Sequence, residues 1–122
     1  MANSNKVHPT VPPQRQEADR LKEQGNQLLG SGDRKGAVEA YSRAIAVDPK
    51  NHVYYSNRSV VYLELGSLEE ALADAEECVS LSPTWAKSHA RKGAALRALK
   101  RYKESIAAYE AGKELLFCGS SS

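Results

Sequence analysis

Five polar residues, far apart in the chain, carry most of the chemistry that this sequence offers. Three are cations, Lys22, Lys87 and Arg91, and two are amides, Asn26 and Asn57. Cationic groups and amide N–H groups are the donors that bind anionic oxygen atoms. Asparagine is a poor helix former. Two asparagines within helical sequence therefore indicate that their side-chain amides have a function. We interpret the five as a site for an anionic oxygen ligand.

A solvated helix face is the competing interpretation. For Lys22 or Lys87 alone it is the simpler one, because lysines are common on protein surfaces. A catalytic or metal site is not indicated, since His52 and His89 have no serine or cysteine partner in a recognisable catalytic motif. We therefore expect no catalytic residue, no metal and no cofactor.

An internal repeat of 34 residues is the strongest pattern in the sequence. Counted from Ala18, it gives repeats at 18–51, 52–85 and 86–119. The alignment places small residues together at Gly25, Ser59 and Gly93, large apolar ones at Leu28, Tyr62 and Leu96, and small ones again at Ala37, Ala71 and Ser105. Small residues let two helices approach closely, so we expect Ala71 at a helix contact. This period is typical of tetratricopeptide repeats.

The glycines, prolines and capping residues of the repeats predict where the helices begin and end. We expect helices over 16–30, 34–47, 51–65, 68–81, 84–98 and 102–116. Ser67 has capping-box spacing to Glu70, and Asp48-Pro49 and Ser82-Pro83 suit an N-cap followed by a first-turn proline. Lys100 stands where the other repeats have Gly32 and Gly66, so we expect that turn to be less tightly specified. The predicted fold is all-α, with three helix-turn-helix repeats stacked as a right-handed superhelical solenoid around a concave groove.

Length and composition set the domain plan and exclude several partners. A chain of 122 residues predicts one domain, over 17–117, between a disordered leader at 1–16 and a flexible tail at 118–122. A net charge of +2 is too small for a nucleic-acid footprint over the whole surface. No apolar run reaches the length of a membrane span. Cys78 and Cys118 lack metal-ligand spacing and indicate reduced thiols in the cytoplasm.

If the first helix of each repeat lines the groove, helical spacing places the five polar residues at one end of it. Apolar residues follow one turn or more further along, at Leu29, Val60, Leu63 and Ala94. Arg97 lies beyond them on the same face, where it either meets acidic residues of a ligand or is simply solvated. Outside the groove, Arg58 is expected to tether adjacent helices. Packing is the expected role of Trp85, Tyr41, Tyr62 and Tyr109.

Three segments resemble one class of tetratricopeptide domain. They are Leu-Lys-Glu-Gln-Gly-Asn at 21–26, Tyr-Ser-Asn-Arg at 55–58 and Trp-Ala-Lys-Ser-His-Ala-Arg-Lys-Gly at 85–93. The chain is similar over about 17–116 to the two-carboxylate-clamp domains of Hsp70/Hsp90 co-chaperones, and most of all to the first such domain in the Hsp-organising (Hop/Sti1) group. The resemblance implies that Lys22, Asn26, Asn57, Lys87 and Arg91 hold a C-terminal Glu-Glu-Val-Asp tail. Both the main-chain carboxylate and the side chain of the final Asp would be bound.

The expected function is therefore a co-chaperone adaptor without catalysis, which binds the C-terminal tail of Hsp70, Hsp90 or both. The sequence leaves the choice between these tails open, because both end alike. Two alternatives also stay open. One is the targeting domain of a chaperone-associated enzyme, such as a phosphatase, a prolyl isomerase or a ubiquitin ligase. The other is a self-association scaffold, since no seventh helix follows the apolar Leu-Leu-Phe at 115–117 and copies would pair weakly through the last helix.

Overall fold

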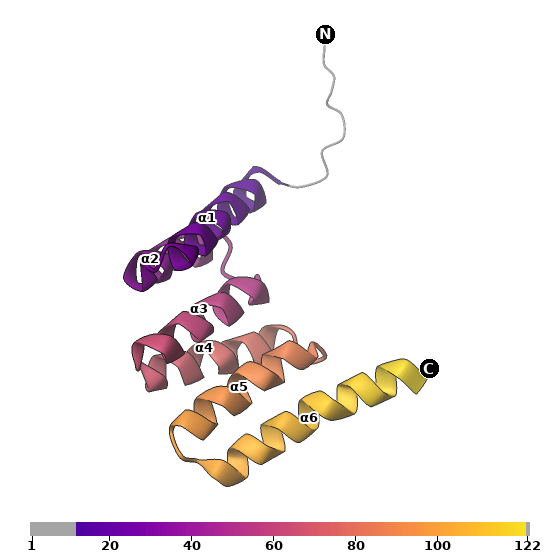
Figure 1. The fold of residues 1–122 in the computed structure, drawn as a ribbon. Coiled ribbons are helices and arrows are strands. Elements are labelled where there is room, and N and C mark those ends of the chain that lie inside the picture. The colour runs from indigo at the N-terminus through magenta and orange to yellow at the C-terminus, as the bar shows by residue number, and fades with distance from the viewer. Residues whose placement is uncertain (1–11, 122) are drawn as a thin grey trace.

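The described part of the chain folds into six helices and contains no strand. The computed structural model describes the backbone of residues 12–121 and the side chains of residues 12–117. The helices are α1 (Pro13–Gly30), α2 (Arg34–Val47), α3 (His52–Leu65), α4 (Leu68–Leu81), α5 (Ala86–Ala98) and α6 (Tyr102–Ser121). They form three successive antiparallel pairs that stack on one another (Figure 1). The predicted all-α repeat fold is confirmed.

Close helix contacts occur at the small residues that the repeat alignment brings together. A Cβ added at Gly25 would lie 2.6 Å from Cε1 of Tyr41, and one added at Gly93 would lie 2.9 Å from the ring of Tyr109. Ala71 is fully buried, and its carbonyl accepts a 2.8 Å hydrogen bond from the hydroxyl of Ser59. A larger side chain at any of these positions would push the paired helices apart. These contacts lie at positions that the 34-residue alignment makes equivalent.

The turn within each helix pair closes in the same way in all three repeats. Gly32, Gly66 and Lys100 have φ angles of 92°, 82° and 65°. In each case the amide of the following residue bonds back to a carbonyl five residues earlier, at 2.8–2.9 Å. The turn at Lys100 was expected to be less tightly specified, but it keeps this geometry. The backbone hydrogen bonds hold a lysine in a conformation that normally favours glycine.

The predicted proline caps are wrong, because both prolines lie in the turns between repeats. Asp48 and Ser82 end α2 and α4 in non-helical backbone conformations, with φ of −138° and −143°. A residue that precedes proline is driven out of the helical region. The next helices begin later, and Asn51 caps α3 by accepting a 2.9 Å hydrogen bond from the amide of Val53. Ser67 does precede α4, but its side chain makes no capping hydrogen bond.

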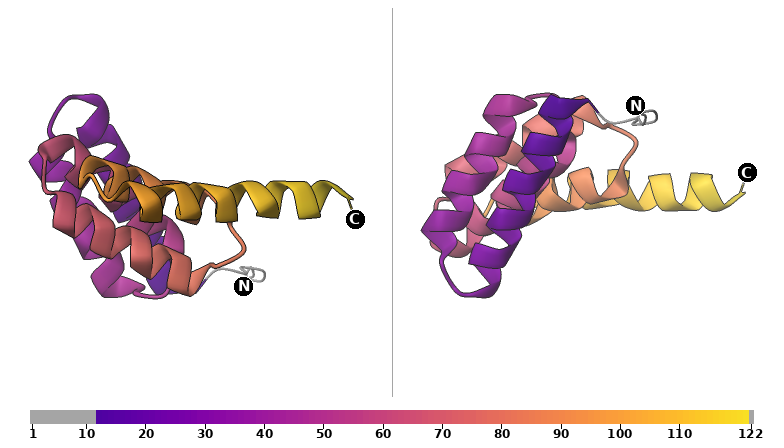
Figure 2. Two further views of the ribbon diagram at one scale, coloured as in Figure 1. Left: turned by 90° about the horizontal axis from the view of Figure 1, so that it is seen from below. Right: turned by 90° about the horizontal axis from the view of Figure 1, so that it is seen from above.

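Two of the helices are longer than predicted. The first, α1, begins at Pro13, a residue whose fixed φ suits a first helical turn. Residues 13–16, assigned above to a leader, are therefore helical, while residues 1–11 lie outside the described residues. At the other end α6 runs to Ser121, and its last turns project beyond α5 (Figure 2). The backbone of 118–121, assigned to a tail, is helical there, and Ser122 is outside the described part.

Apolar side chains lie exposed along α6, on the face that no other described helix covers. Ile106 and Leu116 are 57% and 67% exposed, and Tyr102 and Phe117 are also exposed. Among the described residues, no helix is both long and apolar enough to cross a bilayer.

Candidate anion-binding site

The five polar residues lie on the first helices of the three repeats. Lys22 and Asn26 are on α1, Asn57 is on α3, and Lys87 and Arg91 are on α5. Two side-chain hydrogen bonds link these helices within the described part of the chain. The hydroxyl of Tyr54 on α3 donates to the carboxylate of Asp19 on α1 at 2.5 Å. On the other side, Nε of Arg91 donates to the hydroxyl of Ser56 at 3.1 Å, which places Arg91 beside the residue that precedes Asn57.

Arg91 is a partly buried cation whose charge is not matched by an acid. Burial lowers the pKa of its guanidinium, because a charge that loses water is disfavoured. Its one hydrogen-bond partner in the described part of the chain is the neutral Ser56, and no carboxylate within residues 12–117 pairs with it. A desolvated charge is costly unless an opposite charge compensates it. Arg91 is therefore prepared to bind an anion.

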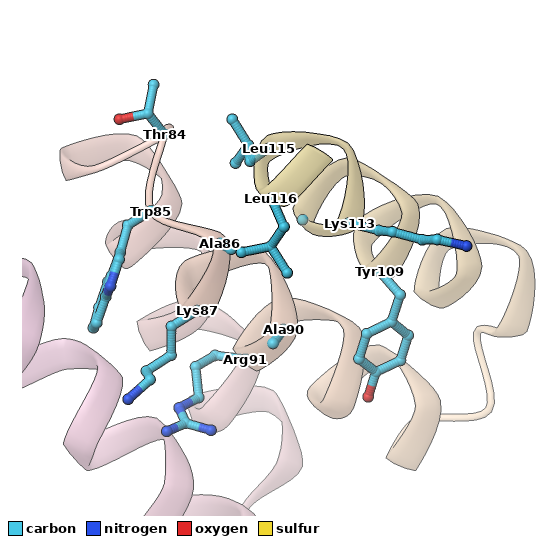
Figure 3. Close-up of a pocket in the computed structure, with 11 residues that line it drawn as sticks. Thr84, Trp85, Ala86, Lys87, Ala90, Arg91, Tyr109, Lys113, Leu115 and Leu116 are labelled. Carbon is cyan, nitrogen blue, oxygen red and sulfur yellow. The ribbon is translucent and has the colours of Figure 1, made fainter. Parts of the chain in front are cut away.

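Lys87 lies one helical turn before Arg91 and is exposed. Its Nζ lies 5.6 Å from the centre of the Trp85 ring, a distance at which the ring face attracts a cation. The side chains of Lys87 and Arg91 point to the same side of α5 (Figure 3). Neither residue forms an ion pair with any residue described here. The two cations together can hold one carboxylate.

On α1, Lys22 and Asn26 face the same side, one turn apart. Nζ of the partly buried Lys22 lies 3.8 Å from a carboxylate oxygen of its exposed neighbour Glu23, which is a loose ion pair. The amide oxygen of Asn26 accepts a 2.5 Å hydrogen bond from the hydroxyl of Tyr41 on α2. Asn57 is half-buried on α3. Each of the two amides is thus held on a helix that lines the same side of the stack.

The predicted apolar groove residues are only partly brought together. Leu63 and Ala94 line one cleft of about 390 Å³, and Arg97 lines it too. Leu29 instead packs against the buried cluster of Ala37, Tyr41 and Val61, and Val60 is half-buried on α3 outside this cleft. Arg97 is exposed, with no ion-pair partner among residues 12–117. The cleft therefore combines an apolar wall with a free cation.

Sequence reasoning missed a larger cleft, which lies between α5 and α6 and opens beside Lys87 and Arg91 (Figure 3). Its volume is about 750 Å³. The lining combines Lys87, Arg91 and Trp85 with small and apolar residues at Ala86, Ala90, Tyr109, Gly112, Leu115 and Leu116. The apolar pair Leu115-Leu116, set against two alanines one turn apart on α5, was the signal available in the sequence.

The residues predicted to be structural are so, with one qualification. Arg58 forms two hydrogen bonds to the Asp74 carboxylate, at 2.7 and 2.8 Å, and a third to Ser42 at 2.8 Å. It therefore links α3 to α4 and α2, as predicted. The Trp85 ring meets the His52 ring edge to face, at 4.7 Å between centroids. The qualification concerns Tyr109, which packs over Gly93 but remains 40% exposed.

Metal ligation is not supported by the described residues, which contain no group of three His, Cys, Asp or Glu side chains able to hold an ion. The site offers hydrogen-bond donors, from two lysines, one arginine and two amides. Such a set binds carboxylate or other oxyanion groups through charge-assisted hydrogen bonds.

Two models of the family described as "Tetratricopeptide repeat" match the chain, over residues 22–84 and 86–115. The Hsp70-Hsp90 organizing protein of Triticum aestivum is 39% identical over 95 residues, which cover 78% of this chain and 16% of that protein. The first curated relatives that the chain matches are all much longer, since it spans between 16% and 28% of their length.

Two solved structures extend the comparison to bound peptides. The first TPR of Spaghetti (RPAP3), bound to the HSP90 peptide SRMEEVD, superposes with a TM-score of 0.81 at 34% identity, covering 83% of this chain and 80% of that one. The second TPR domain of human RPAP3, in complex with the HSP70 peptide SGPTIEEVD, gives 0.80 at 30% identity, covering 84% and 85%. With the six-helix stack and the 34-residue period, these matches show that the chain belongs to the tetratricopeptide repeat family.

Proposed function

We propose that this chain is a co-chaperone adaptor domain, which binds the C-terminal Glu-Glu-Val-Asp tail of Hsp70 or Hsp90 in the cytoplasm and catalyses no reaction itself. The observation that carries the proposal is the partly buried guanidinium of Arg91, which has no carboxylate partner among the described residues. A C-terminal Asp, which carries both a main-chain and a side-chain carboxylate, supplies the missing negative charge.

The five polar residues divide between the two carboxylates of the terminal Asp. Lys22, Asn26 and Asn57 bind the main-chain carboxylate, because a lysine and two amides supply donors from two neighbouring helices. Lys87 and Arg91 bind the Asp side chain. Each of these contacts is a hydrogen bond to a charged group, of the kind that contributes about 1.5–3 kcal/mol.

Residues of the ligand that precede the terminal Asp meet the apolar part of the groove. We propose contacts with Leu29, Val60, Leu63 and Ala94. Arg97 then lies where an acidic residue of the tail can reach it, since it lines the same cleft as Leu63 and Ala94. This arrangement suits a peptide in which acidic and apolar residues alternate close to the C-terminus.

The two peptide complexes among the structural neighbours support this choice of ligand. Both bound peptides, SRMEEVD and SGPTIEEVD, end in Glu-Glu-Val-Asp. Because one comes from HSP90 and the other from HSP70, the neighbours do not favour one chaperone over the other. A titration with both peptides measures the preference of this chain directly.

Amidation of the peptide C-terminus tests the proposal. A free-acid peptide ending in Glu-Glu-Val-Asp should bind at least 10-fold more tightly than its amide, because amidation removes one negative charge and leaves Lys22, Asn26 and Asn57 facing a neutral group. Isothermal titration calorimetry at constant ionic strength provides the two dissociation constants. Equal affinity for the free acid and the amide would rule out the carboxylate-binding function.

A second property, weak pairing of two copies through α6, stays a prediction. It is favoured by the exposed apolar side chains of α6 and by the cleft beside its Leu115 and Leu116. Light scattering over rising protein concentration should show the mean mass increase above that of a monomer. Replacing Leu116 with Glu should abolish the increase, and a wild-type chain that stays monomeric at high micromolar concentration would contradict the prediction.

A further inference from the structure

The amide of Asn26 can serve the proposed site in only one of its two orientations. A carboxylate accepts hydrogen bonds and donates none, so it must meet the NH2 end of the amide and not the oxygen. The two ends have nearly the same shape, and an unrestrained side chain would present either of them to the groove. Something must therefore fix the orientation.

The hydroxyl of Tyr41 supplies that restraint. It lies 2.5 Å from Oδ1 of Asn26. Tyr41 comes from α2, which lies behind α1, and the tyrosine side chain is only 1% exposed. A buried hydroxyl needs a protein partner, because water does not reach it. As Tyr41 donates to Oδ1, the two N–H donors of Nδ2 remain available on the other side of the amide.

The hydrogen bond between Tyr41 and Asn26 depends on the small residue that the repeat places at Gly25. The Tyr41 ring lies so close to Gly25 that an added Cβ would be 2.6 Å from Cε1. With no side chain at Gly25, the ring can lie against α1 and its hydroxyl reaches the next residue, Asn26. The pKa of Tyr41 is raised by burial and, second, by Glu23. The phenol therefore stays protonated at neutral pH and remains a donor.

We propose that Tyr41 is a positioning residue for the anion site: it holds Oδ1 of Asn26 and so turns Nδ2 toward the ligand carboxylate. Tyr41 itself touches no ligand, since it is buried on α2. This inference rests on the proposed binding of a C-terminal carboxylate. It adds a sixth residue to the site, one that cannot be found among the groove-facing positions of the sequence.

Replacing Tyr41 with Phe removes the hydroxyl and keeps the ring. The affinity for the free-acid peptide should fall by about 2- to 12-fold, the range expected when one neutral hydrogen bond no longer orders its partner. The matched control is Tyr55→Phe. The hydroxyl of Tyr55 donates to the carbonyl of Pro49 at 2.9 Å, so this variant also loses one hydrogen bond, but not one made to any of the five site residues. Only Tyr41→Phe should lose affinity.

A double-mutant cycle separates positioning from a general structural effect. If Tyr41 acts through Asn26, then Tyr41→Phe should no longer change the affinity once Asn26 is replaced with Ala. A loss of the same size in the Asn26→Ala background would overturn the inference. So would unchanged affinity in the single Tyr41→Phe variant.

A third measurement needs no substitution. In the wild-type chain, nuclear magnetic resonance should show the side-chain NH2 signals of Asn26 shifting when the free-acid peptide binds, because Nδ2 faces the ligand. Unshifted signals at saturation would overturn the inference. Failure of the proposed function looks different, since the wild-type chain would then not distinguish the free acid from the amide.

Discussion

Replacing Arg91 with Ala is expected to weaken the binding of a free-acid Glu-Glu-Val-Asp peptide by about 10- to 150-fold. The estimate follows from the loss of hydrogen bonds to a charged group, about 1.5–3 kcal/mol, at 1.4 kcal/mol for each factor of ten. Arg91 should have the largest effect among the five residues, because its guanidinium is partly buried and has no carboxylate partner among residues 12–117. Calorimetric titration of the variant and the wild type gives the ratio.

Two further variants show whether the effect belongs to the site. Lys87→Ala should weaken binding in the same range at the lower end, since Lys87 is exposed and its charge is screened by salt. Lys113→Ala removes the same charge from α6, where the side chain points away from Lys87 and Arg91 (Figure 3), and should change the affinity less than twofold. If Arg91→Ala and Lys113→Ala bind the peptide equally well, Arg91 is not part of the site.

Replacing Asp74 with Ala should destabilise the fold by about 3–5 kcal/mol, the cost of breaking a buried ion pair on one side only. The Asp74 carboxylate accepts two hydrogen bonds from Arg58, at 2.7 and 2.8 Å. The two side chains are only 7% and 19% exposed. Without Asp74 the guanidinium would remain buried between α2, α3 and α4 with Ser42 as its one described hydrogen-bond partner. Urea unfolding, followed by circular dichroism, measures the difference.

The Arg34–Glu64 pair provides the control, because it also joins an arginine to a carboxylate but through one hydrogen bond at an exposed site. Nε of Arg34 lies 2.9 Å from a carboxylate oxygen of Glu64, but these side chains are 48% and 43% exposed. An exposed pair of this kind contributes about 0–1 kcal/mol, so Glu64→Ala should leave the urea midpoint nearly unchanged. Equal losses in Asp74→Ala and Glu64→Ala would mean that burial does not set the importance of the Arg58 tether.

The repeat period was sufficient to predict the fold, because each repeat folds as the same local unit. Small residues at Gly25 and Gly93 recur at a fixed spacing, and the structure packs a tyrosine ring against each of them. The N-caps predicted at the residues before the two prolines were wrong. A proline both suits a first helical turn and drives the preceding residue out of the helix. At Asp48 and Ser82 the second effect decided the backbone.

The sequence by itself determined which residues share the groove face, since helical spacing and the 34-residue period fix the position of Lys22, Asn57 and Arg91 on the first helix of each repeat. The tertiary structure decided which of these side chains are held by hydrogen bonds from other helices. It also decided which of the charged side chains have no acidic partner among the described residues. Arg91 is partly buried with no acidic partner among the described residues, which is what makes it central to the proposed site. Tyr41, from another helix, donates a hydrogen bond to Asn26. Desolvation and contacts between helices depend on how the pairs stack, and no pattern within one helix encodes them.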